Sequence, residues 1–334
     1  MSSMTRREWN RAALGSLAAA AASPSPRQAS LTGEYRYLHL DVFTDRALTG
    51  NQLAVFLETP GLDAETMLAI AREMNFSETT FVLPREDEGT DVRMRIFAPD
   101  RELPFAGHPT IGTTFALAHA GVISPDRRRF VFGLGAGPTP VDLEWQESRL
   151  SFAWMTQQRP SFGKVVDQPA AVAACLGVEP SAIQGGDRPV QEVSCGSAFL
   201  LVPMASRQAV DAASLDRRAM ESLYKQLGME RRGVFVFSTE PSSDGATAYS
   251  RMFGFGVVED PATGSASGPL GCYLVRHGVV SPAQAEKILS VQGVKMRRPS
   301  RIHISIGTSG SEIVSVRVGG ESVLVGSGTL NVTV

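Results

Sequence analysis

Apolar and polar residues alternate in short runs from Tyr35 onward. Residues 37–43 and 92–97 alternate, and residues 53–56 and 80–83 are short apolar runs. Period-2 alternation and short apolar runs bounded by turn residues predict β-strands. The chain therefore predicts a fold rich in short strands.

Helical spacing appears between these runs. In residues 63–74, Met67, Ile70, Ala71 and Met74 recur at the helical period, and Asp63 stands at the N-cap position. The second half repeats this style. It predicts strands near 196–202, 233–238 and 248–254, helices near 216–227 and 266–277, and four short strands from about residue 301 to 334.

One segment of the chain is duplicated. Residues 102–125 read ELPFAGHPTIGTTFALAHAGVISP and residues 259–282 read EDPATGSASGPLGCYLVRHGVVSP, identical at eight of 24 positions. Chance at average composition gives about one or two matches. Each copy also follows an Arg-x-Phe strand, at 95–97 and 251–253. Two copies of one strand–loop–helix unit predict two structurally similar domains.

Each copy places a glycine-containing loop before an apolar helix, predicted at 109–120 and 266–277. A buried helix whose N-terminus opens into a cleft offers free backbone N–H groups and the positive end of its dipole. Such an end suits a carboxylate or an enolate-like transition state. Two ends that face one another would hold a small acid from both sides.

Few ionisable residues lie near these loops. His108 follows the loop glycine, and Asp260 stands at the entry of the second loop, where an N-cap role is the structural alternative. Glu102 and Glu259 occur in both copies, so we expect them to hold the loops. Glu78 lies between a helix end and a buried strand, where desolvation would raise the pKa of its carboxyl and suit it to acid/base catalysis.

Composition excludes several functions. A net charge of −2 and 20% charged residues provide no basic surface for nucleic acid or an anionic membrane. The chain has no Gly-x-Gly-x-x-Gly between a strand and a helix and no Gly-Lys-Ser/Thr, which argues against dinucleotide and phosphate-transfer enzymes. The five histidines are dispersed, so no metal site is expected. The three cysteines, Cys175, Cys195 and Cys272, are expected to be small buried residues.

Residues 1–33 are expected to lie outside the fold. Paired arginines, a short apolar stretch and a run of alanines resemble a twin-arginine export signal, and a disordered alanine-rich leader is the alternative. The apolar stretch is too short to span a bilayer. The first alternative predicts an exported, periplasmic protein and the second a cytoplasmic one.

Five motifs together resemble the PhzF family, named for phenazine biosynthesis, whose relatives include diaminopimelate epimerase. The resemblance spans about residue 35 to the C-terminus. The motifs are DVFT at 41–44, GNQLAV at 50–55, NFSETTF at 75–81, FAGHPT at 105–110 and EDPATGSA at 259–266.

The resemblance implies an α/β fold of two similar pseudo-symmetric domains, each a β-barrel-like sheet around a central helix. The expected domains are 34–150, joined by a final strand at about 324–334, and 151–323, with the cleft between them. The resemblance also implies a homodimer and an isomerase that uses neither a metal nor an organic cofactor.

The resemblance further assigns roles in a small-carboxylate site. Glu78 matches the family's catalytic acid/base, which moves a proton between substrate carbons, and His108 and Asp260 match residues of the same pocket. Gly107 and Gly264 match positions whose amides receive the substrate carboxylate. The other expected substrate-binding residues are Asn51, Thr263 and Ser265. The founding activity is isomerisation of trans-2,3-dihydro-3-hydroxyanthranilate.

Three functions remain open. The first is a PhzF-like isomerase of a small carboxylic acid. The second is an amino-acid epimerase or racemase that uses Glu78 as its base, because the two duplicated loops lack the facing cysteines of thiol-dependent relatives. The third is a non-catalytic binding protein for small acids. Cys195-Gly196, where the family usually has a different small residue before glycine, predicts an altered pocket wall.

Overall fold

The computed structural model describes residues 32–256 and 258–333. The predicted export signal falls on residues 1–31, outside the described residues. Thr32 and Gly33, which the sequence assigned to the leader, belong to the first strand. Within the described residues, no helix has the length and apolarity needed to cross a membrane.

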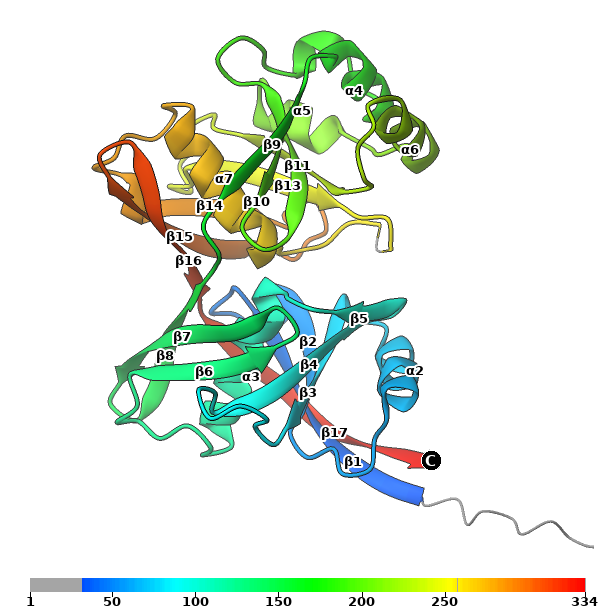
Figure 1. Ribbon diagram of the computed structural model, residues 1–334, viewed down its shortest axis with the longest axis vertical. Coiled ribbons are helices and arrows are strands. Elements are labelled where there is room, and N and C mark those ends of the chain that lie inside the picture. The colour runs from blue at the N-terminus through cyan, green and yellow to red at the C-terminus, as the bar shows by residue number, and fades with distance from the viewer. Residues whose placement is uncertain (1–31, 257, 334) are drawn as a thin grey trace, which may run out of the picture.

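The first half of the chain, blue to green in the lower part of Figure 1, surrounds one buried helix with strands. Its elements are β1 (Thr32–Val42), β2 (Asn51–Phe56), α2 (Ala64–Met74), β3 (Glu78–Leu83), β4 (Val92–Ala98), β5 (Arg101–Leu103), α3 (Gly107–His119), β6 (Arg129–Leu134), β7 (Gly137–Gln146) and β8 (Arg149–Thr156). Helix α3 contacts β1, β2, β3 and β8, so it forms the centre of this half.

The second half, green to orange above it, has the same plan around α7. Its elements are β9 (Ser161–Val166), α4 (Pro169–Cys175), β10 (Val190–Ser194), β11 (Ala198–Pro203), α5 (Arg207–Ala212), α6 (Arg217–Gln226), β12 (Gly233–Ser238), β13 (Ala248–Phe253), α7 (Gly264–Arg276), β14 (Ile288–Gln292), β15 (Ser300–Ser309) and β16 (Glu312–Gly320). The last strand, β17 (Ser322–Thr333), belongs to the first half. Helix α7 contacts β10, β11, β15 and β16.

Strand pairing repeats between the halves. The neighbours β17-β1-β2-β3-β4-β6-β7-β8 recur as β9-β10-β11-β12-β13-β14-β15-β16. In each series the third and fourth strands pair in parallel, as do the fifth and sixth, and the other pairs are antiparallel. The predicted fold of two similar halves, each with strands around a central helix, is confirmed.

The duplicated unit keeps its side-chain interactions as well. Helices α3 and α7 both have 13 residues, and each is followed by a glycine with positive φ, Gly121 at 73° and Gly278 at 65°. Glycine without a Cβ suits this left-handed position. In both halves an arginine and the shared glutamate form a two-bond ion pair, at 2.7 and 2.6 Å for Arg95–Glu102 and at 2.9 and 2.8 Å for Arg251–Glu259.

The last strand returns to the first half. Strand β17 pairs antiparallel with β1 from Thr32 to Val42. It lies beside β1 in the lower part of Figure 1. The chain closes with three strands, β15 to β17. The prediction of four short strands is wrong, because the observed strands are fewer and longer. The expected domain division stays a prediction; residues 150 and 323 fall inside β8 and β17.

Helix α2 illustrates how local sequence produces an element. Asp63 accepts a hydrogen bond from the Thr66 N–H at 2.8 Å, so it caps the helix as predicted. Met67, Ile70 and Ala71 are buried at helical spacing. The helix ends at Met74, and the following cap residue, Asn75, has a left-handed φ of 51°. This end delivers the chain directly to Ser77 and Glu78 at the start of β3.

Candidate active site

A cavity of about 640 Å³ lies between the two halves. The first half contributes the start of β3, the β4–β5 turn and the loop before α3. The second half contributes residues after β10, residues before β12 and the segment around α7. The wall consists of Ser77, Glu78, Ala98, Pro99, Asp100, Arg101, Leu103, Phe105, Ala106, Gly196, Ser197, Ala198, Phe199, Arg231, Arg232, Gly233, Met252, Gly254, Phe255, Gly256, Asp260, Thr263 and Ser265.

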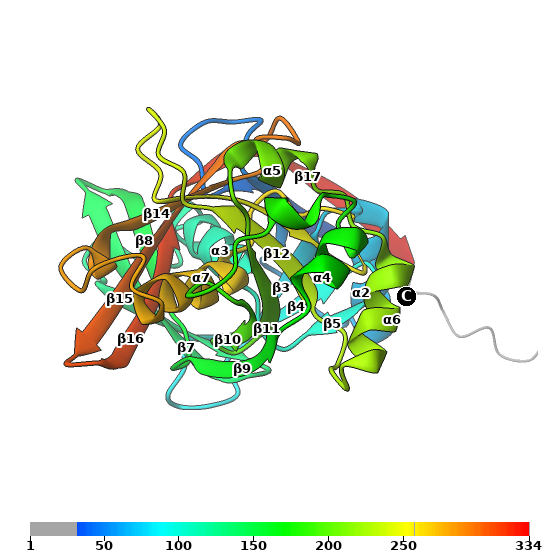
Figure 2. The same ribbon diagram turned by 90° about the horizontal axis from the view of Figure 1, so that it is seen from above.

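Helices α3 and α7 meet at their N-termini beside this cavity. Figure 2, seen from above, draws the two helices next to each other. Gly107 and Gly264 are their first residues. A Cβ built on Gly107 would lie 2.6 Å from the Gly264 Cα and the Ser265 backbone nitrogen. Neither preceding residue, Ala106 or Thr263, caps its helix with a side chain. The expected pair of facing helix N-termini is therefore present, and its close approach requires glycine.

Glu78 and Asp260 bring two carboxyl groups to the cavity wall. Asp260 Oδ1 accepts hydrogen bonds from Asn51 Nδ2 and from the Ser77 hydroxyl, both at 2.8 Å. Asp260 Oδ2 accepts one from the Thr263 hydroxyl at 2.5 Å. Burial raises the pKa of Asp260, and these three hydrogen bonds oppose that effect.

Glu78 has a different environment. Its Oε2 atom is buried 3.3 Å from His108 Nδ1 and receives no hydrogen bond from the described residues. Burial, followed by the negative charge of Asp260, raises the pKa of Glu78 well above the usual carboxyl range, and the charge of Arg101 opposes this. Three donors stabilise the Asp260 carboxylate, whereas none of the described residues donates to Glu78 Oε2, so the pKa of Glu78 is the more strongly raised of the two.

His108 is a neutral imidazole in this site. It is only 3% exposed, and burial lowers the pKa of its side chain to about 3, with the Gln52 backbone carbonyl opposing. A neutral ring keeps one nitrogen as an acceptor. His108 Nδ1 lies 3.1 Å from Asn51 Nδ2 as well as 3.3 Å from Glu78 Oε2. The ring therefore connects Glu78 to the amide that holds Asp260.

The structure brings together all eight residues that the sequence assigned to the site, at two depths. Glu78, Asp260, Thr263 and Ser265 form part of the cavity wall. The other four residues are not among the described residues of the wall. His108 and Asn51 contact the wall carboxylates from the interior, and Gly107 and Gly264 directly follow the wall residues Ala106 and Thr263.

Sequence reasoning missed two groups of functional residues. Gln292, at the end of β14, holds the second loop by donating from Nε2 to the Asp260 carbonyl at 2.7 Å and accepting from the Thr263 N–H at 3.0 Å. The far wall, including Phe199, Arg231 and Phe255, was also missed. These residues lie in segments without a distinctive motif, so no local signal could have placed them at the cavity.

The cysteines are buried, as expected. Cys195 Sγ and Cys272 Sγ lie 3.7 Å apart, and this contact and burial raise the pKa of the Cys272 thiol. The described wall contains no cysteine, although Gly196, beside Cys195, is part of it. Within the described chain, no three or more His, Cys, Asp and Glu side chains form a group that could hold a metal ion.

Two similar halves, two facing helix ends and a buried carboxyl pair between them define a class of protein. The chain is an isomerase with a diaminopimelate-epimerase-like fold, because its curated relatives are named isomerases and its structural neighbours include epimerases. More particularly, residues 40–328 match the family model described as phenazine biosynthesis-like protein, and the chain belongs to that family.

Individual relatives agree with this assignment. The chain is 36% identical over 296 residues to trans-2,3-dihydro-3-hydroxyanthranilate isomerase of Pseudomonas aeruginosa, covering 88% of this chain and 98% of that one. The structure of a predicted epimerase from Pseudomonas aeruginosa is 34% identical with a TM-score of 0.74, over 89% and 99% of the two chains. A PhzF-family protein of Bacillus anthracis, 24% identical, shares the fold with a TM-score of 0.79, over 90% and 100%.

Proposed function

We propose that this protein isomerises a small carboxylic acid, such as a trans-2,3-dihydro-3-hydroxyanthranilate-like compound, by acid/base proton transfer through Glu78 without a cofactor. The observation that carries this proposal is the Glu78 carboxyl itself. It lies in the cavity wall, its Oε2 atom is buried, and burial together with Asp260 raises its pKa. A carboxyl poised nearer to working pH serves as base and then as acid.

The proposed reaction needs only one acid/base group. The Glu78 carboxylate takes a proton from one substrate carbon, and the electron pair of that C–H bond forms a new double bond to the adjacent carbon. The π electrons of the existing double bond move to its far carbon, which is then protonated. The same carboxyl then returns the proton to a second carbon, so the double bond shifts and the overall composition is unchanged. The N-termini of α3 and α7 bind the substrate carboxylate and stabilise the charge that develops.

The surrounding residues support this step. Asp260 keeps a negative charge near Glu78 and so holds the Glu78 pKa high. His108 is neutral, so it places no positive charge beside Glu78 that would lower that pKa. Ser265 presents a hydroxyl group near the start of α7 for polar atoms of the substrate. The Thr263 hydroxyl instead donates to Asp260 Oδ2 and accepts from Gln292 Nε2, so it holds the catalytic loop. Phe105, Phe199 and Phe255 form an apolar part of the wall that suits a ring.

Deuterium exchange followed by NMR in heavy water tests the proposal. A panel of small acids, including trans-2,3-dihydro-3-hydroxyanthranilate, is incubated with wild type, Glu78→Gln and the control Glu73→Gln, an exposed carboxylate on α2. We expect label to enter one compound with wild type and control, and the rate to fall about 10²- to 10⁴-fold in Glu78→Gln. Exchange at the wild-type rate in Glu78→Gln would refute the mechanism.

One observation favours a second candidate, an amino-acid epimerase that uses Glu78. A second carboxyl, Asp260, shares the cavity and could protonate the opposite face of a carbanion. The same experiment separates the two functions. Exchange of an amino-acid α-proton with inversion at that carbon indicates epimerisation, whereas label at a new carbon with a shifted double bond indicates isomerisation.

A further inference from the structure

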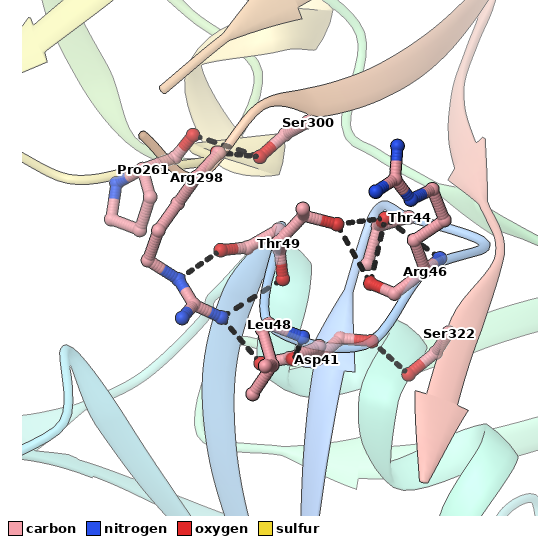
Figure 3. Close-up of polar contacts among 10 residues, drawn as sticks. Asp41, Thr44, Arg46, Leu48, Thr49, Pro261, Arg298, Ser300 and Ser322 are labelled. Atoms are coloured by element: carbon pink, nitrogen blue, oxygen red, sulfur yellow. Dashed lines mark hydrogen bonds and ion pairs between the residues drawn. The ribbon is translucent and has the colours of Figure 1, made fainter. Parts of the chain in front are cut away.

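Arg298 reaches from the second half of the chain into the first. It lies between β14 and β15, and Figure 3 shows its guanidinium beside Asp41 and Thr49. Arg298 Nη2 donates to Asp41 Oδ1 at 2.5 Å and to the Thr49 carbonyl at 2.9 Å, and Nε donates to the Gly50 carbonyl at 2.8 Å. One side chain thus holds the end of β1 and the two residues that precede β2.

The loop that Arg298 holds is tied together internally. The Thr44 and Thr49 hydroxyls lie 2.5 Å apart, and the Thr49 hydroxyl donates to the Arg46 carbonyl at 2.7 Å. The Leu48 N–H donates to the second carboxylate oxygen of Asp41 at 2.6 Å. Because residues 44–49 are linked to one another and to Asp41, a bond to Thr49 restrains the whole loop (Figure 3).

Asn51 directly follows this loop and extends its amide into the active site. Its Nδ2 atom lies 2.8 Å from Asp260 Oδ1, 2.9 Å from the Ala262 carbonyl and 3.1 Å from His108 Nδ1. The position of Asn51 therefore determines how Asp260 and the His108–Glu78 contact are arranged. Gly50, whose carbonyl Arg298 binds, is the residue that joins the two networks.

The segment that contains Arg298 also holds the catalytic loop of the second half. Gln292 donates to the Asp260 carbonyl at 2.7 Å, and the Ser300 hydroxyl donates to the Pro261 carbonyl at 3.0 Å. Residues 292–300 therefore bind the loop around Asp260 at both ends, and Arg298 between them binds the loop before Asn51. This single segment therefore connects the two loops that meet at the active site, because it forms hydrogen bonds to both.

We propose that Arg298 is a positioning residue that sets the distance between Asn51 and Asp260 and thereby aligns His108 with Glu78. The inference rests on the proposed function of Glu78. Arg298 acts through its rigid planar fork, which places donors on three acceptors at once. A lysine at this position keeps the positive charge beside Asp41, but a single ammonium group cannot reproduce the fork.

A measurement without substrate tests the link from Arg298 to the site. The chain has five histidines, so ¹⁵N-labelled histidine and an assignment variant, His108→Gln, identify the His108 ring signals by NMR. We expect Arg298→Lys to shift the His108 Nδ1 signal in the direction seen in Asn51→Ala. The control Arg297→Asn removes the neighbouring exposed arginine at a left-handed position, φ 59°, and should leave the signal unchanged. An unchanged signal in Arg298→Lys, or in Asn51→Ala, overturns the proposal.

Kinetics then separate positioning from general stability. At temperatures where the variant remains folded, we expect Arg298→Lys to lower kcat/KM about tenfold. In an Asn51→Ala background, the same substitution should lower kcat/KM by less than a further factor of about two. Equal effects in both backgrounds would mean that Arg298 does not act through Asn51, which overturns the proposal. Retained exchange in Glu78→Gln would instead refute the proposed function, while the histidine spectra still decide the role of Arg298.

Discussion

Gly107→Ala is the perturbation that most directly probes the junction of α3 and α7. The added Cβ would lie 2.6 Å from the Gly264 Cα and carbonyl carbon and from the Ser265 nitrogen, all backbone atoms that cannot move by changing a rotamer. Ordinary van der Waals contact for a Cβ begins at 3.4 Å, so the two helix ends must separate by about 0.8 Å.

This separation affects stability and activity differently. Overpacking costs about 1–3 kcal/mol, which for a chain of this size lowers Tm by roughly 1–4 °C. A displacement near 1 Å in groups that position a substrate costs about 10²-fold in rate. We therefore expect kcat/KM for the exchanged acid to fall about 10²-fold in a protein that remains folded at assay temperature.

Gly89→Ala is the matched control, because a Cβ built there meets no atom within 4 Å. Both variants are compared with wild type by circular dichroism during thermal unfolding and by steady-state kinetics. The reasoning fails if Gly107→Ala keeps kcat/KM within about twofold of wild type and has the same Tm as Gly89→Ala. That result would mean that the close approach of the helices is not required.

Three further predictions concern charge and capping. Asp260→Asn removes the negative charge that, together with burial, raises the pKa of Glu78. The acidic limb of the pH profile of kcat/KM, where the Glu78 carboxylate forms, should therefore move to lower pH, and an unmoved limb contradicts this. Arg251→Ala leaves its buried partner carboxylate unpaired and removes hydrogen bonds to three backbone carbonyls, so it should cost about 3–5 kcal/mol in urea unfolding. The more exposed duplicate Arg95→Ala should cost about 1 kcal/mol or less, and equal losses argue against the burial explanation. Asp63→Ala removes the side-chain cap of α2 and should lower the urea midpoint of unfolding with unchanged kcat/KM. An unchanged midpoint would show that the cap does not stabilise the fold.

Much of the fold could be predicted because its signals are local. The helix capped by Asp63 and the strand at 233–238 follow from residue spacing, and the structure has them at α2 and β12. The duplicated segment predicted two equivalent helices, and α3 and α7 are related by the same offset as the sequences. The closing strands were less predictable because their lengths depend on pairing partners, such as β1 for β17.

Candidate residues came from the duplicated loops, from the position of Glu78 and from the family motifs, but their arrangement did not. The hydrogen bond from Asn51 to Asp260 joins residues 209 positions apart, and that from Arg298 to Asp41 joins residues 257 apart. The far wall around Phe255 and the contact between Gly107 and Gly264 likewise depend on how the halves pack. Local spacing determines which face of an element is apolar and where it begins, whereas packing between distant segments decides which polar groups share one desolvated cavity.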